Sequence, residues 1–254
     1  MEVSIRYPKP RTLVLMGHSF IRRLGAFMNN VQHYANLRLQ KDSFEVLIRA
    51  RGGLKTYELA NSRELLDFQS IHIDNGICYK QIGGNDFTDP QATPRDVARQ
   101  IMALTHFLLV TNNFSYVIIG QLLRRHPSKV GSHFNTKVID TNKLLHDQYH
   151  SSNSNLIFWH HRGFWNPDMK YLARDGIHIK DSYHGHRFMS KYLQSVKSVV
   201  LHASHFERRN KMPPKKRKTV TTNPNPQRKK RLHTQTSPVA SPPCDVVDAH
   251  HYLQ

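Results

Sequence analysis

Residues 12–24 read TLVLMGHSFIRRL, and they join a short apolar run to a segment suited to a helix. The apolar run stops at Gly17, the chain passes through Ser19, and helix-compatible residues follow to about Asn29. A Ser between a strand and a helix lies at the carboxyl edge of a parallel sheet, where open α/β folds usually bind ligands. Two interpretations are open at this point: Ser19 is a nucleophile, or it only caps the helix.

Four more short apolar runs follow in the chain, at residues 44–50, 77–82, 116–120 and 156–159. Segments with apolar residues at helical spacing alternate with them, at residues 55–68, 94–108, 134–149 and 188–200. Nearly unbroken apolar strands are what a parallel sheet buried on both faces requires, because each crossover helix covers one face. The sequence therefore predicts a three-layer α/β fold of about 200 residues.

The charge balance is strongly basic, with 37 Lys and Arg against 18 Asp and Glu, a formal net charge of +19. Such an excess suggests contact with polyanions. The two cysteines, Cys78 and Cys244, form neither a disulfide framework nor a metal quartet, so we expect a reducing compartment. No apolar run approaches the roughly 18 residues of a membrane span, and the N-terminal residues have no apolar core of a signal peptide. We therefore expect a protein that has no membrane span and is not secreted.

The composition changes near residue 207 and divides the chain into a domain, 1–206, and a tail, 207–254. The tail holds 11 Lys and Arg against 3 Asp and Glu, is rich in Pro, and has no apolar periodicity, so we expect it to be disordered. Its basic clusters are typical of a nuclear import signal. The first cluster comprises Lys215, Lys216, Arg217 and Lys218. The sequence thus predicts a nuclear or nucleocytoplasmic protein that binds an import receptor, with a solvated charge run as the alternative.

Direct nucleic-acid binding by this tail would be weak, independent of sequence and strongly dependent on salt. Basic residues neutralise phosphates without reading bases, and no aromatic residue is interleaved with them to stack on a base.

Three of the predicted strands end in small or polar residues: Ser19, then Gly52-Gly53, then the GGND sequence at 83–86. The carboxyl ends of parallel strands lie along one edge, so these residues can converge. A Ser, a Gly backbone N–H and the Asn85 amide would give a nucleophile and two donors for an oxyanion. One such donor is worth about 2.7–4 kcal/mol in the transition state.

A base is available in the loop after the fifth strand, where Asp175 precedes His178 by three residues. A carboxylate at this spacing can fix the tautomer of the imidazole and stabilise its protonated form. The pair alone is weak evidence, because the chain has 18 His and most histidines have surface or structural roles. His160, His161, His184 and His186 are not joined by Cys or acidic residues at ligand spacing, and no phosphate-binding loop occurs. We expect no metal and no cofactor.

Taken in order, the blocks at 17–19 (GHS), 52–53, 83–86 (GGND) and 175–178 (DGIH) resemble those of the SGNH hydrolase family, also called GDSL esterases and lipases. The resemblance covers roughly residues 10–202. It implies a flavodoxin-like sheet with strand order 2-1-3-4-5 and metal-free hydrolysis of carboxylic esters, with a small ester or acylated molecule as substrate. It also implies residue roles. Ser19 would be the nucleophile and an oxyanion donor, Gly53 and Asn85 the other donors, His178 the base and Asp175 its orienting acid.

The sequence departs from the family pattern at His18, where the family usually has an Asp that is not part of the triad. The change alters the charge beside the nucleophile. In the second block, Gly52 could serve as the donor instead of Gly53. The GHSFIRRL form at 17–24 is also similar to esterase-like domains of mobile genetic elements. The alternative function is a weakly active or inactive nuclear accessory protein that keeps this fold and binds nucleic acid or protein partners.

Overall fold

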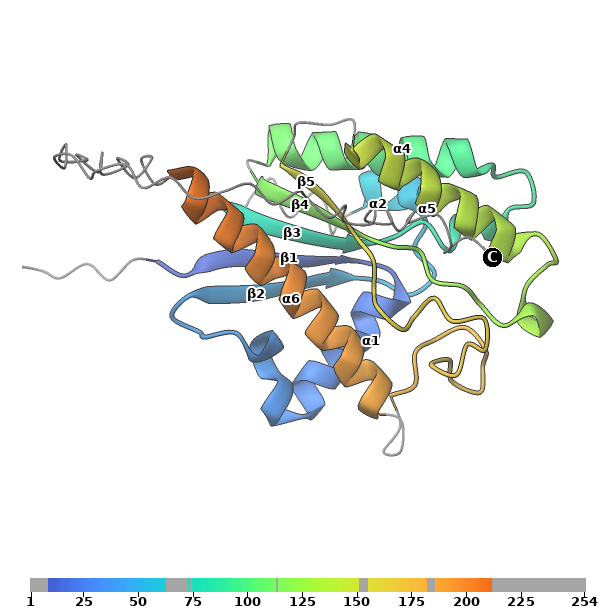
Figure 1. The fold of residues 1–254 in the computed structure, drawn as a ribbon, viewed down its shortest axis with the longest axis horizontal. Helices are drawn as coiled ribbons and strands as arrows, with labels where there is room; N and C mark the ends of the chain where they lie inside the picture. The colour runs from blue at the N-terminus through green and yellow to red at the C-terminus, as the bar shows by residue number, and fades with distance from the viewer. Residues whose placement is uncertain are drawn as a thin grey trace, which may run out of the picture. The chain divides into compact units, whose positions relative to one another are not determined.

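The structure is a computed structural model, and it describes residues 9–62, 73, 75–112, 114–150, 155–181 and 186–211. Five strands and the helices between them alternate along this part of the chain (Figure 1). The strands are β1 (Arg11–Gly17), β2 (Phe44–Ala50), β3 (Gly76–Gln81), β4 (Phe114–Gly120) and β5 (Leu156–Trp159). The α-helices are α1 (Ser19–Asn30), α2 (Thr56–Ala60), α4 (Pro94–Thr111), α5 (Phe134–His150) and α6 (His186–Lys211). Short 3-10 helices lie at η1 (Gln32–Arg38), η2 (Asp86–Thr88) and η3 (Pro127–Lys129).

The five strands form one parallel sheet in the order β2-β1-β3-β4-β5, which confirms the predicted order. Gly17 at the end of β1 lies opposite Ala50 of β2 and Gln81 of β3. The segments that follow these three strands therefore leave the sheet side by side at one edge.

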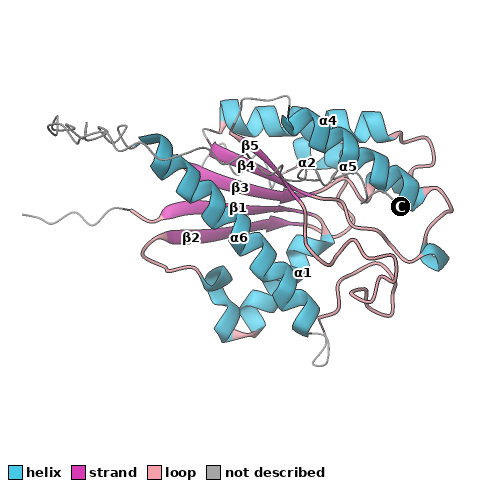
Figure 2. Cartoon of the chain, viewed as in Figure 1, coloured by secondary structure: helices cyan, strands magenta, loops and turns pink. Residues whose placement is uncertain are grey.

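Helices cover both faces of the sheet, with α1 and α6 on one side and α2, α4 and α5 on the other (Figure 2). Alternate residues of β1 enter the two cores. Leu13 and Leu15 pack in the core under α1 and α6, and Val14 and Met16 pack in the core under α4 and α5. A strand buried on both sides needs an unbroken apolar sequence, and for this reason residues 12–16 identified the fold class.

Two helices differ in extent from the prediction. The helix expected at residues 55–68 is observed as α2, Thr56–Ala60, and residues 63–72 lie outside the described part. The last helix, α6, continues to Lys211, so the domain limit expected after residue 206 falls within it.

The chain separates into two units, Met1–Pro213 and Pro214–Gln254. The import cluster at 215–218 and Cys244 lie outside the described residues. Cys78 is buried in β3 as a free thiol. Among the helices that the structure describes, none combines the length and apolar character needed to cross a bilayer.

Candidate active site

Ser19 is the first residue of α1, and one residue, His18, separates it from Gly17 at the end of β1. The residue that caps the helix is His18, whose Nδ1 accepts a hydrogen bond from the Phe20 N–H at 3.4 Å. The capping role considered for Ser19 thus belongs to its neighbour. The Ser19 hydroxyl instead points to His178, with 2.9 Å between Oγ and Nε2.

His178 is oriented by Asp175, as the spacing in the sequence predicts. The Asp175 Oδ2 lies 2.7 Å from His178 Nδ1, and its Oδ1 accepts the backbone N–H groups of Ile177 and His178 at 2.9 Å each. Partial burial raises the pKa of Asp175, but the hydrogen bonds from those two backbone N–H groups and from the imidazole outweigh it and lower the pKa to about 2. The ionised carboxylate can only accept, so Nδ1 carries the proton, and in the neutral ring Nε2 accepts the Ser19 O–H.

Arg23 connects helix α1 to the loop that carries the base. Its Nη2 lies 3.8 Å from Asp175 Oδ2, and its Nη1 donates to Asp181 Oδ2 at 2.9 Å. The two ion pairs of Arg23 therefore connect the helix that begins with Ser19 to the loop that carries His178. Sequence analysis gave Arg23 no role, because basic residues are common on exposed helix faces.

Gly52 and Gly53 follow β2, and Asn85 follows β3, so both groups leave the sheet beside Ser19. Side-chain hydrogen bonds tie the two loops together: Asn85 Nδ2 donates to the Leu54 carbonyl at 3.1 Å, and Asp86 Oδ1 accepts the Thr56 N–H at 3.1 Å. Among the described residues, none accepts a hydrogen bond from the N–H groups of Ser19, Gly52 or Gly53. These N–H groups and the second Asn85 amide hydrogen are available to a ligand.

Arg125, in the loop after β4, is a further residue of this site. It is 5% exposed, and its Nη2 donates to Asn85 Oδ1 at 2.6 Å. Burial lowers the pKa of the guanidinium to about 10, so it stays charged at neutral pH. The bond holds the amide oxygen of Asn85 away from the position of an oxyanion. In the sequence Arg125 follows another Arg in a polar loop, and nothing there distinguishes it from a solvated residue.

His18, the departure from the family pattern, is buried and uncharged. Burial, and then the positive charges of Arg125 and His178, lower its pKa from 6.5 to about 3. A neutral imidazole thus stands where the family usually has a carboxylate, and the Arg125 guanidinium is the charged group that lowers its pKa most. The sequence predicts an altered charge beside the nucleophile. Because a neutral imidazole replaces a carboxylate, the electrostatic potential beside Ser19 is more positive than in the usual family pattern.

Two of the histidines considered as metal ligands, His160 and His161, are engaged in hydrogen bonds. His161 is buried between the Tyr79 hydroxyl and Ser195 Oγ at 2.8 Å each, and His160 Nδ1 lies 2.8 Å from Gln121 Oε1. In the described ranges, no group of three or more His, Cys, Asp or Glu side chains could hold a metal ion. The sequence-predicted position His184 lies outside those ranges.

No family model matches the chain, and no curated protein sequence matches it. Solved structures with the same fold are found. A GDSL-like lipase from Bacteroides thetaiotaomicron has a TM-score of 0.55 at 15% identity, over 79% of this chain and 93% of that one. A lipase/acylhydrolase from Enterococcus faecalis has a TM-score of 0.53 at 15% identity, over 74% and 96% of the two chains. An acetylxylan esterase from Geobacillus stearothermophilus has a TM-score of 0.53 at 11% identity, over 75% and 96%.

The sheet order and the three layers place the chain among the flavodoxin-like α/β proteins. Within that class it has the fold of the SGNH hydrolases, the GDSL-type lipases and acylhydrolases, which confirms the predicted fold. The narrower link to mobile genetic elements stays a prediction.

Proposed function

We propose that this chain is a serine esterase that hydrolyses carboxylic esters. The observation that carries the proposal is the hydrogen-bonded series Ser19 Oγ, His178 Nε2, His178 Nδ1 and Asp175 Oδ2, with separations of 2.9 Å and 2.7 Å. A nucleophile, a base and a group that orients the base within hydrogen-bond reach are what acyl transfer requires.

The proposed reaction has two halves. In the first, Ser19 Oγ attacks the ester carbonyl, His178 takes the hydroxyl proton, and the carbonyl oxygen becomes an oxyanion held by the N–H groups of Ser19 and Gly53 and by the Asn85 amide. The C–O bond to the alcohol then breaks, and the alcohol leaves with the proton from His178. In the second half, water loses a proton to His178 and attacks the acyl group, and Ser19 regains the proton as the acid leaves.

A fluorophosphonate probe tests this proposal, because it reacts only with an activated serine. We expect labelling of the wild type and of Ser198→Ala, an exposed serine on α6 that serves as the matched control. Ser19→Ala should not be labelled. An unlabelled wild type, under conditions that label a known serine esterase, would rule the catalytic function out.

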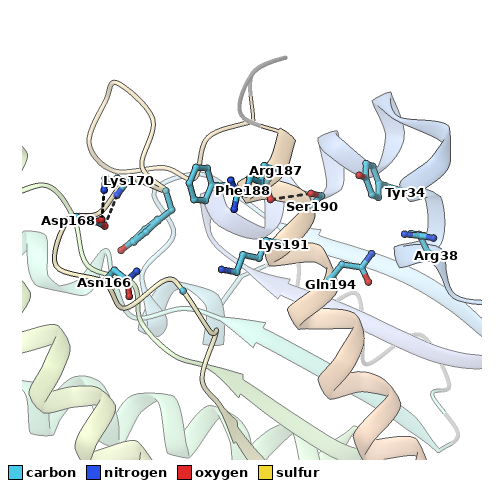
Figure 3. Close-up of a pocket in the computed structure, with 12 residues that line it drawn as sticks. Tyr34, Arg38, Asn166, Asp168, Lys170, Arg187, Phe188, Ser190, Lys191 and Gln194 are labelled. Carbon is cyan, nitrogen blue, oxygen red and sulfur yellow. Dashed lines mark hydrogen bonds and ion pairs between the residues drawn. The ribbon is translucent and has the colours of Figure 1, made fainter. Parts of the chain in front are cut away.

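A second candidate function, polyanion binding, is favoured by a groove of about 800 Å³ between η1, the loop before Asp175 and the start of α6 (Figure 3). We define the basic groove by Tyr34, Arg38, Lys170, Arg187, Phe188 and Lys191, all of which line it. Four of these residues are cationic, and the one acidic side chain in the lining, Asp168, is paired with Lys170 at 3.1 Å. Cations beside half-buried aromatic rings are the combination used to bind single-stranded nucleic acid.

Binding of a fluorescently labelled single-stranded RNA to the full chain tests this candidate. We expect Arg38→Glu/Lys191→Glu to weaken binding clearly more than Arg95→Glu/Arg99→Glu, a control on α4 with the same charge change. Equal weakening in the two double variants would mean that the basic groove adds nothing to the general charge of the chain.

We further propose that residues 215–218 direct the protein to the nucleus through an import receptor. The support is the sequence Lys-Lys-Arg-Lys after two prolines. A fluorescent fusion should accumulate in nuclei and lose this accumulation when these four residues are changed to Ala. Unchanged accumulation would contradict the import role.

A further inference from the structure

A pocket of about 630 Å³ lies between the first turn of α5, the segment after Asn85 and Ile177, the residue before the base His178. We name it the lateral pocket, and the residues that define it here are Phe87, Arg125, Lys129, Phe134, Lys137 and Ile177. Three of them belong to the segments that carry the candidate site, and one of the three is Arg125 itself, which binds Asn85. Ile177 lies directly before His178, and Phe87 follows Asn85 by two residues. A group bound in this pocket would therefore be next to the reacting ester.

The floor of the lateral pocket combines aromatic rings with a buried cation. Phe87 and Phe134 are both buried and meet edge to face, with ring centroids 6.1 Å apart. The guanidinium carbon of Arg125 lies 4.7 Å from the centroid of the Phe134 ring. Among the described residues, no carboxylate lies within ion-pair distance of Arg125, whose one side-chain hydrogen bond goes to the neutral Asn85 amide. A buried charge without a counter-ion is costly, so an anionic ligand group here would be stabilised.

The walls of the lateral pocket add more positive charge. Lys137, on α5, donates through Nζ to the carbonyls of Pro90 and Ala92 at 2.8 Å each, which fixes the ammonium at the pocket. Lys129 also lines the pocket, and its side chain passes close to Gly176. The described residues that line the pocket include no Asp and no Glu.

The loop that carries Arg125 and Lys129 is also attached to the loop that carries the base. The His126 N–H donates to the Gly176 carbonyl at 2.7 Å. Gly176 has a φ of +67°, and a Cβ there would approach the Lys129 and His126 side chains to 2.8 Å. The segment that carries Arg125 and Lys129 is thus hydrogen-bonded to the Asp175–His178 turn. This link holds the two positive charges at a fixed place beside the candidate site.

We propose that the lateral pocket binds an anionic group of the ester substrate, a carboxylate or a similar small anion separated from the scissile ester by a short apolar spacer. The spacer would lie against Phe87 and Phe134, and the anion would meet Arg125, Lys129 and Lys137. This assignment rests on the proposed esterase function and adds the substrate class to it. The anion can belong to the acyl part or to the alcohol part of the ester, and the two sources are separated by experiment.

Two matched substrate pairs test the assignment on the full chain. The first pair, 4-nitrophenyl hydrogen glutarate and 4-nitrophenyl pentanoate, differs by a carboxylate at the end of the acyl chain. The second, 4-acetoxybenzoate and its methyl ester, differs by a carboxylate on the alcohol. We expect the wild type to favour the anionic member of one pair by about tenfold in kcat/KM, the size of one charge-assisted hydrogen bond.

Variants then assign the preference to the lateral pocket. Lys137→Met and Lys129→Met should each reduce the ratio of anionic to neutral kcat/KM about three- to tenfold, because each removes one cation from the wall. Lys143→Met, an exposed position on the same helix as Lys137, is the matched control and should leave the ratio unchanged. Lys129→Met keeps the test valid if loss of the Lys137 hydrogen bonds unfolds the loop.

The outcomes separate the two proposals. Hydrolysis of both members of each pair with equal kcat/KM would overturn the anion assignment and leave the esterase function in place. So would a preference that both lysine variants retain in full. No hydrolysis of any of the four esters, together with an unlabelled Ser19, would overturn the esterase function and the substrate assignment with it.

Discussion

At the scale of single residues, the role of Asp175 depends on its charge. Its carboxylate accepts three hydrogen bonds, two from the backbone and one from the imidazole, and these hold its pKa at about 2. It therefore remains an acceptor at every pH near neutrality and keeps the His178 proton on Nδ1. The tautomer that can deprotonate Ser19 is set by this one side chain.

Exchange of Asp175 for Asn should abolish most of the esterase activity without unfolding the protein. Asn can still accept from the Ile177 and His178 N–H groups, but its amide donates to Nδ1 and moves the imidazole proton to Nε2. We expect kcat to fall by about 10³–10⁴-fold, as expected for the wrong tautomer. The measurement is kcat for 4-nitrophenyl pentanoate, with Asp140→Asn, exposed on α5, as the control. A loss below tenfold would show that Asp175 does not orient the base.

Exchange of Arg125 for Met should lower kcat for the same neutral ester more than it changes KM. The guanidinium orients the Asn85 amide, and a donor that is misaligned stabilises the oxyanion less. The expected loss is about ten- to hundredfold, smaller than the loss on removing an oxyanion donor outright. Arg124→Met, whose guanidinium stacks over Trp165, is the matched control. A change confined to KM would make Arg125 a binding residue only.

Sequence alone made Ser19, Asn85, Asp175 and His178 candidates, because each belongs to a short motif in the loop after a predicted strand. Arg125 was missed for a physical reason. Its role depends on burial and on the path of the loop after β4, and neither leaves a periodic pattern in the sequence. Which of Gly52 and Gly53 donates its N–H to an oxyanion depends on the direction of the backbone in that turn. The sequence does not specify this direction.

At the scale of elements, the junction between β1 and α1 is under the tightest steric control. Gly17 has a φ of +151°, and a Cβ there would lie 2.1 Å from the carbonyl oxygen of Gln81. The close approach of β1 and β3 at this point brings Ser19 and the Asn85 loop to the same edge. Any side chain at position 17 would separate them.

The exchange Gly17→Ala should lower the free energy of unfolding by about 2–5 kcal/mol, the sum of backbone strain and overpacking. Ser19 should also lose reactivity with the fluorophosphonate, because the junction between β1 and α1 that positions it is displaced. Gly131→Ala is the matched control, since Gly131 is exposed and no atom lies within 4 Å of its added Cβ. Urea unfolding checks the difference. Equal stability of the two variants would contradict the steric argument.

The strands were predictable as elements, and the ends of the helices were less so. Buried parallel strands have unbroken apolar sequences, which stand out against the amphipathic helices. The start of α4 has signals that a sequence displays directly, because Thr93 caps the helix through its side chain and Pro94 occupies the first helical position. The end of α6 was not marked, because the charged and polar residues at 207–211 continue the helix without apolar periodicity.

At the scale of the molecule, buried neutral histidines make stability depend on pH. Burial, and next to it the charge of His160, lower the pKa of His161 from 6.5 to about 3. The pKa of His18 is also lowered to about 3, and burial is the largest cause. Between pH 6.5 and 3 the unfolded chain binds protons at these positions that the folded chain does not. Their contribution to stability is complete above pH 6.5 and is lost progressively as the pH falls toward 3.

We therefore expect the free energy of unfolding to decrease on acidification below pH 6.5, by about 1.4 kcal/mol per pH unit for each of the two histidines. In His161→Gln this slope should be smaller by one such contribution. His106→Gln, exposed on α4, should keep the wild-type slope. Urea unfolding between pH 7 and pH 5 measures the slopes, and identical slopes in wild type and His161→Gln would contradict a neutral buried His161.

The hydrogen bond from the His126 N–H to the Gly176 carbonyl has a consequence for how this protein can change over generations. An insertion or deletion in either loop would displace the His178 imidazole together with Arg125 and Lys129. Such a protein would lose esterase activity before it gained a preference for another substrate. Descendants with other substrates should therefore differ by exchanged side chains at positions 129, 133 and 137, of which His133 also lines the lateral pocket, at unchanged loop lengths. Randomising these three positions in a library of variants is accordingly the most direct way to alter the substrate specificity.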